Sequence, residues 1–553
     1  MFKQKIDNTN SQGEISSVSA VLDSAHIGDI KGALGTIRVG NDAHEKTFRS
    51  KFRTLAAIIG PGIIVMAGDN DAGAFGTYTQ AGQNYGTKLL WTLLLLVPVL
   101  YVNQEMVLRL GIVTGVGHAR LILERFGKFW GSFSVIDLFV LNSLTIVTEF
   151  IGIHFGLSYL GLPTIPGVIV AALFVILAAS TGSFRKFERV CLILVVGSLT
   201  VIPIVLMTHP RLGQVAHDFV VPGLPHGARL STVMLLIIAI VGTTVAPWQL
   251  FFQQSYVIDK RITPRFMRYE KIDLWLGIVI VIVGGSVMMI FSTSTFSGHP
   301  EFGNFTDAAG VATGLSHYVS NGAGILFAIA LIDASIIGAA AVGLSTSYAV
   351  ADVFGFHHSL HRKPSEAKLF YFIFFLLIGV SATIVLIPGS PLGLLTEGVQ
   401  TLAGVLLPSA AVFLLLLCND KEVVGPWINN YRTNLFTSMV IAVLIMLSII
   451  LTAGVLYPSI GSSTILAILI GGSVMTVIAL VVAFVVQFKK PKSRTAVKIS
   501  YQKKILWHMP ALSLLQKPVL SLSRRIWLAT LRGYLIIASF LVIYRLIQLA
   551  YGK

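Results

Sequence analysis

The residues best suited to bind a ligand lie in one apolar stretch, which runs from Gly60-Pro-Gly to Asp69-Asn-Asp71-Ala-Gly-Ala74. A charged side chain in hydrocarbon costs about 2.5–3.5 kcal/mol even on lenient scales, so two carboxylates in such a stretch indicate a function. Glycine and proline let a helix unwind, which frees backbone carbonyls for other partners. Carboxylates beside a broken helix at membrane depth are what a cation site in a transporter requires.

The composition of the whole chain is that of a polytopic membrane protein. Of its 553 residues, 54% are hydrophobic and only 12% are charged, whereas a soluble domain has about 25% charged residues. Long apolar runs such as 89–102 and 465–486 point to helices that cross a bilayer. The net charge of +16 does not indicate a nucleic-acid partner, because most basic residues lie between the apolar runs or in the tails.

The chain divides into three regions. Residues 1–50 are rich in Ser, Gly, Asn and Asp and show no signal peptide, so we expect a disordered cytoplasmic tail. Residues 51–487 contain about twelve apolar spans and form the transport domain. Residues 488–553 are a basic cytoplasmic or interfacial tail, and its last apolar stretch, 534–551, is interpreted as interfacial, with a thirteenth tilted span as the alternative.

Basic residues gather in alternate loops of this arrangement. They cluster at 46–53, 120–128, 185–189, 260–271, 362–368 and 489–494. The positive-inside rule then predicts a multi-pass protein of the cell membrane with both termini in the cytoplasm. The outer segment 293–313 carries Glu301 and Asp307 without Lys or Arg, which either attracts cations or is an ordinary polar loop.

A second break is expected in the sixth span, which reads Val241-Gly-Thr-Thr-Val-Ala246-Pro247-Trp248. Proline removes a hydrogen-bond donor and clashes with the preceding turn, so the helix unwinds before it. The first and sixth spans are thus both interrupted, five spans apart. Matching breaks at this separation indicate an inverted repeat with a binding site at the midplane, as in secondary transporters.

The motifs around these breaks resemble those of the Nramp metal transporters. The matches run in order from about 51 to 487 and comprise Gly60-Pro-Gly62, Asp71 with Gly73, Gln80-Ala-Gly82, Gln104 with Arg109-Leu-Gly-Ile-Val-Thr-Gly115, Glu149-Phe-Ile-Gly152, Gly242-Thr-Thr-Val-Ala-Pro247, and Gln400 with Pro408. The resemblance implies an all-α LeuT-type fold. That fold has two inverted five-helix repeats plus two further spans, with helices 1 and 6 broken.

The departures from the family pattern fall at its metal ligands. Where the family has Asp-Pro-Gly-Asn, this chain has Ala74 in place of the asparagine. Ala246 replaces the methionine ligand, and Trp248 and Gln253 replace two histidines. This pattern resembles the Nramp-related magnesium transporters, a branch of the same superfamily.

The chemistry of these changes agrees with a hard cation. A thioether favours transition metals over magnesium, so Ala246 leaves a site that offers only oxygen. Magnesium prefers octahedral oxygen and sheds its water reluctantly. Ala74 and Ala246 also leave space for a partly hydrated ion. Manganese accepts oxygen ligands too, and we expect it to be tolerated.

The candidate ligands are acids and oxygen donors near the two breaks. Asp71 is expected to bind the ion directly, with helix capping as its compatible alternative. Asp69 is either a second carboxylate or faces a solvated vestibule. By resemblance Thr243 contributes its backbone carbonyl, and Gln400, like Thr244, is an oxygen donor or an interhelical hydrogen-bond partner. Asp333, in the eighth span, is either functional or paired with a polar neighbour.

Other residues are assigned to the pathway. Glu149 lies on a polar pathway or makes a structural hydrogen bond, and Glu105 and Arg109 form an i,i+4 pair that is structural or gating. Trp248 and Gln253 cannot titrate near neutral pH as histidine can, so we expect electrogenic, channel-like or uniport transport without proton coupling. Three histidines lie at 357, 358 and 361, but no set of cysteines or carboxylates surrounds them in the sequence, so they do not indicate a specific metal site.

The leading hypothesis is an importer of a hard divalent cation, most directly magnesium. The alternatives are a manganese or iron importer with a variant site, an amino-acid carrier of the same fold, and a membrane sensor. We expect no enzymatic activity, no catalytic residue, no cofactor apart from the transported ion and no obligate protein partner, with membrane lipid as the surroundings. Cys191 and Cys418 lie far apart, so no disulfide or zinc site is indicated.

Overall fold

The structure is a computed structural model that describes residues 20–40, 47–225, 227–388, 392–457, 460–489 and 500–516, with a few single positions between 518 and 544. Most of the described residues are helical. The helices of the first half are α2 (Phe48–Ile58), α3 (Pro61–Gly68), α4 (Ala72–Tyr85), α5 (Leu90–Thr114), α6 (His118–Phe126), α7 (Lys128–Tyr159), α8 (Thr164–Ala179), α9 (Phe184–Gly197), α10 (Val201–Met207) and α11 (Leu212–Val220).

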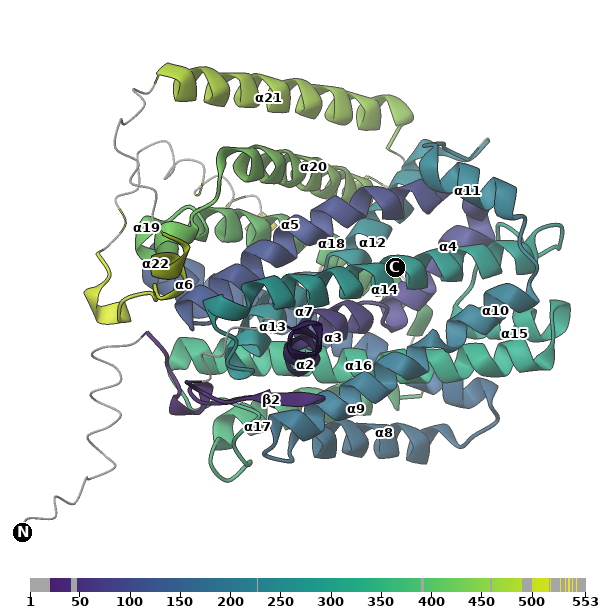
Figure 1. The fold of residues 1–553 in the computed structure, drawn as a ribbon. Coiled ribbons are helices and arrows are strands. Elements are labelled where there is room, and N and C mark those ends of the chain that lie inside the picture. The colour runs from purple at the N-terminus through teal and green to yellow at the C-terminus, as the bar shows by residue number, and fades with distance from the viewer. Residues whose placement is uncertain are drawn as a thin grey trace, which may run out of the picture.

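The second half continues in the same way. Its helices are α12 (Leu230–Thr244), α13 (Pro247–Asp259), α14 (Met267–Phe296), α15 (Ala308–Tyr318), α16 (Asn321–Phe354), α17 (Lys368–Val385), α18 (Leu392–Leu417), α19 (Lys421–Val424), α20 (Tyr431–Leu456), α21 (Ser462–Lys489) and α22 (Tyr501–Ile505). The long helices run side by side, with α6, α19 and α22 at one end and α11 and α15 at the other (Figure 1). We call the first the α22 end and the second the α15 end.

The helices are long and apolar enough for a multi-pass membrane protein. Within the described residues, nine helices can cross a bilayer, or ten if α2 and α3, bent by 45°, count as one span. The expectation of about twelve spans exceeds ten because α8, Thr164–Ala179, and the part of α18 that is counted, Leu407–Leu417, are shorter apolar helices. Large apolar side chains such as Leu177 and Val196 are exposed on the outside of the bundle, as a surface in contact with lipid requires.

The expected breaks are present in two neighbouring helix pairs. The chain leaves helical geometry between α3 and α4, at Asp69–Asp71, and between α12 and α13, at Val245–Ala246. Proline starts both α3 and α13, where its missing N–H costs nothing. The broken pairs pack together, since α4 contacts α12 and α3 contacts α13, while α14 covers α3 and α4 and α16 lies along α7. The buried core surrounds both breaks.

Gly60, just before α3, is required by its backbone and its surroundings. Its φ is +150°, and an added Cβ would lie 2.2 Å from Glu188 Oε1 and 3.0 Å from Lys260 Nζ. Any side chain would therefore strain the backbone and displace a buried ion pair. The α3 helix then begins with its N–H groups facing Asp273 of α14, whose carboxylate accepts from Gly60 N at 3.0 Å and Gly62 N at 2.6 Å.

Residues 20–40, which composition placed in a disordered tail over 1–50, are folded. They form a 3-10 turn, Ser24–His26, and an antiparallel hairpin of β1 (Ile30–Gly32) and β2 (Gly35–Ile37) at the α22 end. The hairpin packs directly on α2, because an added Cβ on Gly32 would lie 2.0 Å from the Ala57 carbonyl oxygen. The prediction of disorder is wrong for residues 20–40, because a few side chains of this polar segment, such as that of Ala33, are buried against helix ends. Residues 1–19 and 41–46 lie outside the described residues.

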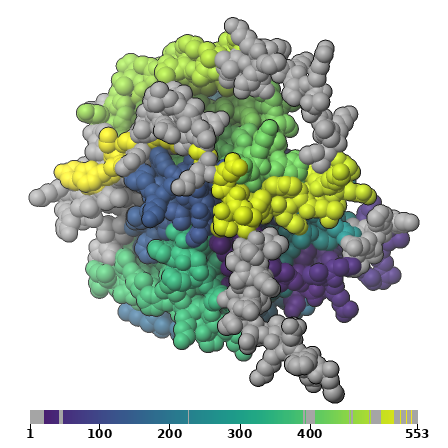
Figure 2. Space-filling view, turned by 90° about the vertical axis from the view of Figure 1, so that its left-hand side faces the viewer, coloured from purple at the N-terminus to yellow at the C-terminus, as the bar shows by residue number. Residues whose placement is uncertain are grey.

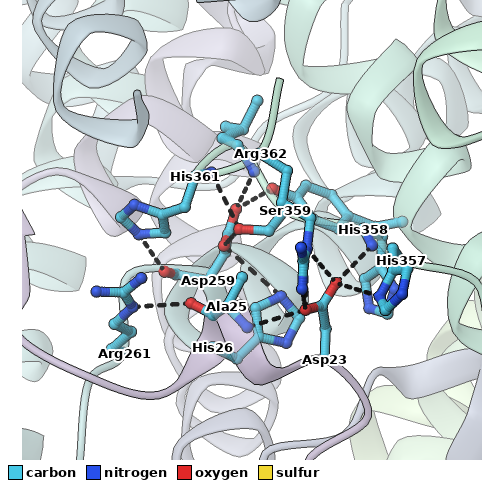
Figure 3. A network of polar contacts seen from close by, with 12 residues as sticks. Asp23, Ala25, His26, Asp259, Arg261, His357, His358, Ser359, His361 and Arg362 are labelled. Atoms are coloured by element: carbon cyan, nitrogen blue, oxygen red, sulfur yellow. Dashed lines mark hydrogen bonds and ion pairs between the residues drawn. The ribbon is translucent and has the colours of Figure 1, made fainter. Parts of the chain in front are cut away.

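The segment before the hairpin is held by a polar network with the loop after α16 (Figure 3). Asp23 accepts hydrogen bonds from His358 N at 2.8 Å and Arg362 Nη2 at 2.6 Å. Arg261 donates to the carbonyl oxygen of Ala25 at 2.9 Å. The Arg362 guanidinium and two N–H donors hold the pKa of Asp23 well below its usual range, although burial of the carboxyl opposes this.

His358 gives this network a pH dependence. Burial lowers its pKa, but the Asp352 carboxylate at 2.9 Å raises it more, from 6.5 to about 9. Because the folded pKa lies above the unfolded one, its stabilisation is complete below pH 6.5 and is lost as the pH rises through about 9. We expect protection of residues 20–37 from proteolysis to fall over this window. Burial lowers the pKa of the neighbouring His26, so His26 weakens the docking only in acid.

Limited proteolysis from pH 6 to 10 measures this effect. His358→Gln removes the titrating ring and is expected to flatten the profile, whereas His317→Gln, at an exposed ring of α15 at the opposite end, should leave it unchanged. An unchanged profile in His358→Gln would contradict the assignment.

Candidate metal site

Asp71 stands at the start of α4, inside the first break. It is buried, and its Oδ1 accepts a hydrogen bond from Ala74 N at 2.8 Å, so it caps the helix. Ala74 is also buried, and it adds no ligating atom beyond its backbone. The cap is compatible with the ligand role that the sequence suggested, because a capping carboxylate keeps lone pairs that can bind an ion.

Asp69 ends α3 and is also buried, with no exposed surface. Gln249, in the first turn of α13, donates to its Oδ1. Its Oδ2 has no hydrogen-bond partner among the described residues. The structure thus places Asp69 inside the protein and not at the wall of a solvated vestibule, and it leaves one carboxylate oxygen for a further ligand.

Glu149 of α7 brings a third carboxyl group to the break. Its Oε2 accepts from Ala72 N at 3.2 Å, and its side chain lies beside that of Asp71. An added Cβ on Gly338 of α16 would be 2.6 Å from the Glu149 carboxyl carbon, so the glycine makes room for this group. Packing of α7 against α4 and α16 therefore completes the acidic cluster.

The second break supplies backbone oxygen. Pro247 has no N–H to bond to the carbonyl of Thr243 four residues earlier, so this carbonyl lacks its helical donor. The Thr243 hydroxyl also lacks a partner among the described residues. Ala246 is buried at the start of α13 and makes no side-chain cap. Thr244 is instead held by Tyr78 of α4, whose hydroxyl is 2.6 Å away.

Trp248 and Gln253, which replace the family's histidines, lie on the side of this cluster that faces the α22 end. The Trp248 ring lies 3.5 Å from where a Cβ of Gly68 would be, so it packs between α13 and α3. Gln253 donates to Glu270 of α14 at 3.4 Å. These side chains fill the space between the helices and neither of them reaches Asp71 in a described contact.

The remaining candidate residues lie elsewhere. Asp333 is on α16, and its carboxylate faces Gly197 of α9, with no described contact to the acidic cluster. Gln400 is on α18, but its side chain lies outside the described residues. Glu105 and Arg109 pair at 3.2 Å, and Lys271 of α14 adds a second ion pair to Glu105 at 2.8 Å. Arg109 also donates to the carbonyl of Trp427, near the α22 end.

Sequence reasoning missed several residues that the structure assigns to this region. Gln249 donates to Asp69 and to the Thr244 carbonyl at 3.2 Å, and accepts from Gln104 at 2.9 Å. The sequence signal that could have identified Gln249 is a polar side chain within one turn of the second break. Lys260 and Glu188 form a fully buried ion pair at 2.6 Å. Lys260 belonged to a basic cluster that was interpreted as a topology signal only.

The cluster lies next to a pocket that faces the α15 end. Its lining includes Ala72 and Thr77 of α4, Thr148 and Gly152 of α7, and Asp307 just before α15. Ala72 bonds to Glu149, so the pocket ends beside the acidic cluster. Asp307 also caps α15 through Gly310 N at 2.8 Å.

The electrostatics of the cluster favour a cation. Asp69, Asp71 and Glu149 are buried. Their described polar contacts are backbone N–H groups, one amide and the contact between the Asp71 and Glu149 carboxyl groups, and none of them is Lys or Arg. Buried carboxylates without a basic partner are costly, so a cation or protons must offset them. Within the described residues, no group of three His, Cys, Asp or Glu side chains is placed to hold a metal ion.

Comparison with known proteins agrees with this chemistry. Residues 62–454 match the family described as natural resistance-associated macrophage protein-like, or Nramp. The fold is similar to the Eremococcus coleocola manganese transporter in complex with an aromatic bis-isothiourea compound, at 20% identity and a TM-score of 0.59, with 81% of this chain and 98% of that chain covered. A histidine-to-alanine mutant of that transporter gives 19% identity and a TM-score of 0.60, covering 83% and 98%.

These likenesses confirm the LeuT-type fold with its inverted repeats and its broken helices 1 and 6. The family match covers well over half of the chain and both breaks. The protein therefore belongs to the Nramp family of divalent metal transporters.

Proposed function

We propose that this transporter imports a hard divalent cation, Mg²⁺, as a partly hydrated ion and without proton coupling. The observation that carries the proposal is the donor set at the two breaks. It consists of the Asp71 and Asp69 carboxylates and the Thr243 carbonyl, and alanine stands at 74 and 246. Such a set offers oxygen alone, which suits magnesium and gives no advantage to softer metals.

The small number of protein donors suits an ion that keeps part of its water. Two carboxylates and one carbonyl leave coordination positions of an octahedral ion for water molecules. Magnesium keeps several waters in most protein sites because it dehydrates reluctantly. The buried Oδ2 of Asp69, which lacks a described partner, can accept a hydrogen bond from such a water.

Restoring a sulfur ligand tests this donor set. Ala246→Met is expected to shift selectivity at least tenfold from Mg²⁺ toward Mn²⁺, because a thioether favours transition metals. The measurement is uptake of each ion into liposomes that contain the purified protein. Ala246→Leu is the matched control, since it adds similar bulk without sulfur and should reduce both fluxes alike. Equal selectivity in the Met and Leu variants would contradict the assignment of Ala246.

The alternative within the family is an importer of manganese or iron with a variant site. Asp71 and the Thr243 carbonyl would serve that ion too, and Mn²⁺ accepts oxygen ligands. An amino-acid carrier of the same fold is disfavoured, because Asp69, Asp71 and Glu149 would repel a substrate carboxylate.

Uncoupled transport follows from what replaces the histidines of the sixth span. Trp248 and Gln253 cannot carry a proton near neutral pH. The membrane potential alone supplies about 2.3 kcal/mol per charge per 100 mV, and a divalent ion gains twice that amount. We expect Mg²⁺ uptake into liposomes to leave the lumenal pH unchanged.

Glu149 is the protonatable group beside Asp71, and it provides the control for this prediction. Acidification of the lumen in proportion to Mg²⁺ uptake, abolished by Glu149→Gln, would show a coupled proton and contradict the proposal. Liposomes loaded with a pH-sensitive dye measure both outcomes.

We further propose that the protein resides in the cell membrane with the α22 end in the cytoplasm. The residues that hold the N-terminal segment at this end are predominantly basic, namely Arg185, Arg189, Arg261 and Arg362. The positive-inside rule places such loops in the cytoplasm. The pocket beside the acidic cluster then faces outward, as an importer needs for loading.

A further inference from the structure

One short N-terminal stretch, residues 23–36, is hydrogen-bonded to several elements at the α22 end. Figure 2 looks onto this end, where purple N-terminal residues lie at the surface beside teal residues from the middle of the chain. The hairpin of this stretch meets α9. The carbonyl oxygens of Gly32 and Ala33 accept from Arg185 Nε at 3.0 Å and from Arg189 Nε at 2.9 Å, respectively.

The same hairpin also reaches the buried part of this end. Ala33 N donates to Glu188 Oε2, and the other carboxylate oxygen of Glu188 pairs with Lys260 at the end of α13. Gly32 lies against the carbonyl oxygen of Ala57 in α2, which would be 2.0 Å from an added Cβ. The hairpin therefore connects α9 with α2 and with the ion pair at the end of α13.

The residues before the hairpin are hydrogen-bonded to two further places (Figure 3). Arg261, which follows α13, donates to the carbonyl oxygens of Ala25 at 2.9 Å and Asp29 at 3.1 Å. Asp23 accepts from Arg362, in the loop between α16 and α17, at 2.6 Å. One short stretch is thus bonded to α9, to the end of α13 and to the loop after α16, and it packs on α2.

These elements close the α22 side of the acidic cluster. The α3 helix, which follows α2, packs against α9, α13 and α16, and α13 packs against α16. The Trp248 ring lies between α13 and α3. The pocket beside the cluster faces the α15 end. Transporters of this fold open their site to each side in turn, so an ion can pass the α22 end only if these helices move apart.

The bonds of the stretch favour the closed arrangement of these elements. They come from Arg185, Arg189, Arg261 and Arg362 and from the Glu188 carboxylate. Loss of one hydrogen bond to a charged group changes an equilibrium by about tenfold. Since the docked stretch meets all of its partners only while they are together, docking shifts the population toward the state in which the α22 side is closed.

We propose that residues 20–37 act as an inhibitory latch at the α22 end. While docked, the latch holds α2, α9, the end of α13 and the loop after α16 together and slows the step in which this side opens. Release of the latch lets this side open and speeds transport. The inference rests on the transport proposed above, but not on which divalent ion is carried.

Gly32→Val is designed to release the latch. The added side chain does not fit against the backbone of α2, so the hairpin is expected to undock and residues 20–37 to be cleaved faster in limited proteolysis. Leu34→Val is the matched control, because it places the same side chain at an exposed position of the same hairpin. Arg362→Gln releases the other end of the stretch by removing the partner of Asp23.

Cysteine labelling measures the opening of the α22 side without any ion. Gln253→Cys places a thiol on α13, between the acidic cluster and the α22 end, where the native side chain is fully buried. A water-soluble thiol reagent reacts there when this side opens, and mass spectrometry identifies the labelled cysteine. In this background Gly32→Val is expected to raise the labelling rate about tenfold, and Leu34→Val to leave it unchanged.

Uptake of the divalent ion into liposomes is the second readout. With native Gln253, both Gly32→Val and Arg362→Gln are expected to increase uptake about threefold, which is less than the effect on labelling because other steps also limit the rate. Faster proteolysis of the segment without faster labelling would refute the latch. Uptake by both release variants at or below the rate of a transporting wild type would refute it too. Faster labelling in Gly32→Val, with no uptake by wild type or variants, would contradict the proposed function and still support the latch.

Discussion

Asp71→Ala is expected to abolish divalent cation uptake, with a loss on the order of 100-fold, or about 2.7 kcal/mol. The residue lies at the break between α3 and α4, is buried, and has one oxygen engaged by Ala74 N. Its side chain also lies beside that of Glu149. Loss of the carboxylate removes a negative charge from the first break, and uptake into liposomes measures the result.

A second variant separates ion binding from folding. Because Asp71 caps α4, its replacement by alanine also costs about 0.5–2 kcal/mol of stability. Asparagine caps a helix about as well as aspartate but carries no charge. Asp71→Asn should therefore keep the stability of the wild type and still lose uptake. Uptake at the wild-type rate in Asp71→Asn would mean that Asp71 serves only as a cap.

Lys260→Met is expected to destabilise the protein by about 3–5 kcal/mol, because it leaves a buried carboxylate without its partner. Lys260 is fully buried, pairs with Glu188 at 2.6 Å, and donates to the carbonyls of Ile58 at 2.5 Å and Ile59 at 2.8 Å. It thus joins the end of α13 to α9 and to the start of the first broken helix. Equilibrium unfolding in mixed detergents measures the loss.

Two controls accompany this variant. Lys271→Met makes the same substitution in a partly exposed pair with Glu105, where about 1 kcal/mol or less is expected. The double variant Glu188→Gln with Lys260→Met removes both charges and should be more stable than Lys260→Met alone. If Lys260→Met and Lys271→Met were equally mild, the buried pair would not be what joins α13 to α9.

The breaks could be predicted from the sequence because their causes are local. Proline at 247 and a capping aspartate at 71 act through the backbone of their own segment. The sequence leaves Glu149 either on a polar pathway or in a structural hydrogen bond, because its position beside Asp71 depends on how α7 packs against α4. No pattern within the sequence of either helix predicts that contact.

The N-terminal segment could not be predicted because its order comes from tertiary contacts. Its composition is polar, and only residues such as Asp23 and Ala33 are buried. Asp23 meets His358 and Arg362 from more than 300 positions away in the chain. Secondary-structure propensity does not predict such long-range pairings. The same limit applies to Lys260, whose partner Glu188 lies 72 residues before it.

The most direct test of the account is uptake of Mg²⁺ into liposomes that contain the purified wild-type protein, with Mn²⁺ as competitor. A site of oxygen donors alone predicts Mg²⁺ uptake that Asp71→Asn abolishes, with Mn²⁺ competing at concentrations similar to those of Mg²⁺. Uptake of Mn²⁺ without Mg²⁺, or block of Mg²⁺ uptake by Mn²⁺ at concentrations lower by orders of magnitude, would contradict it.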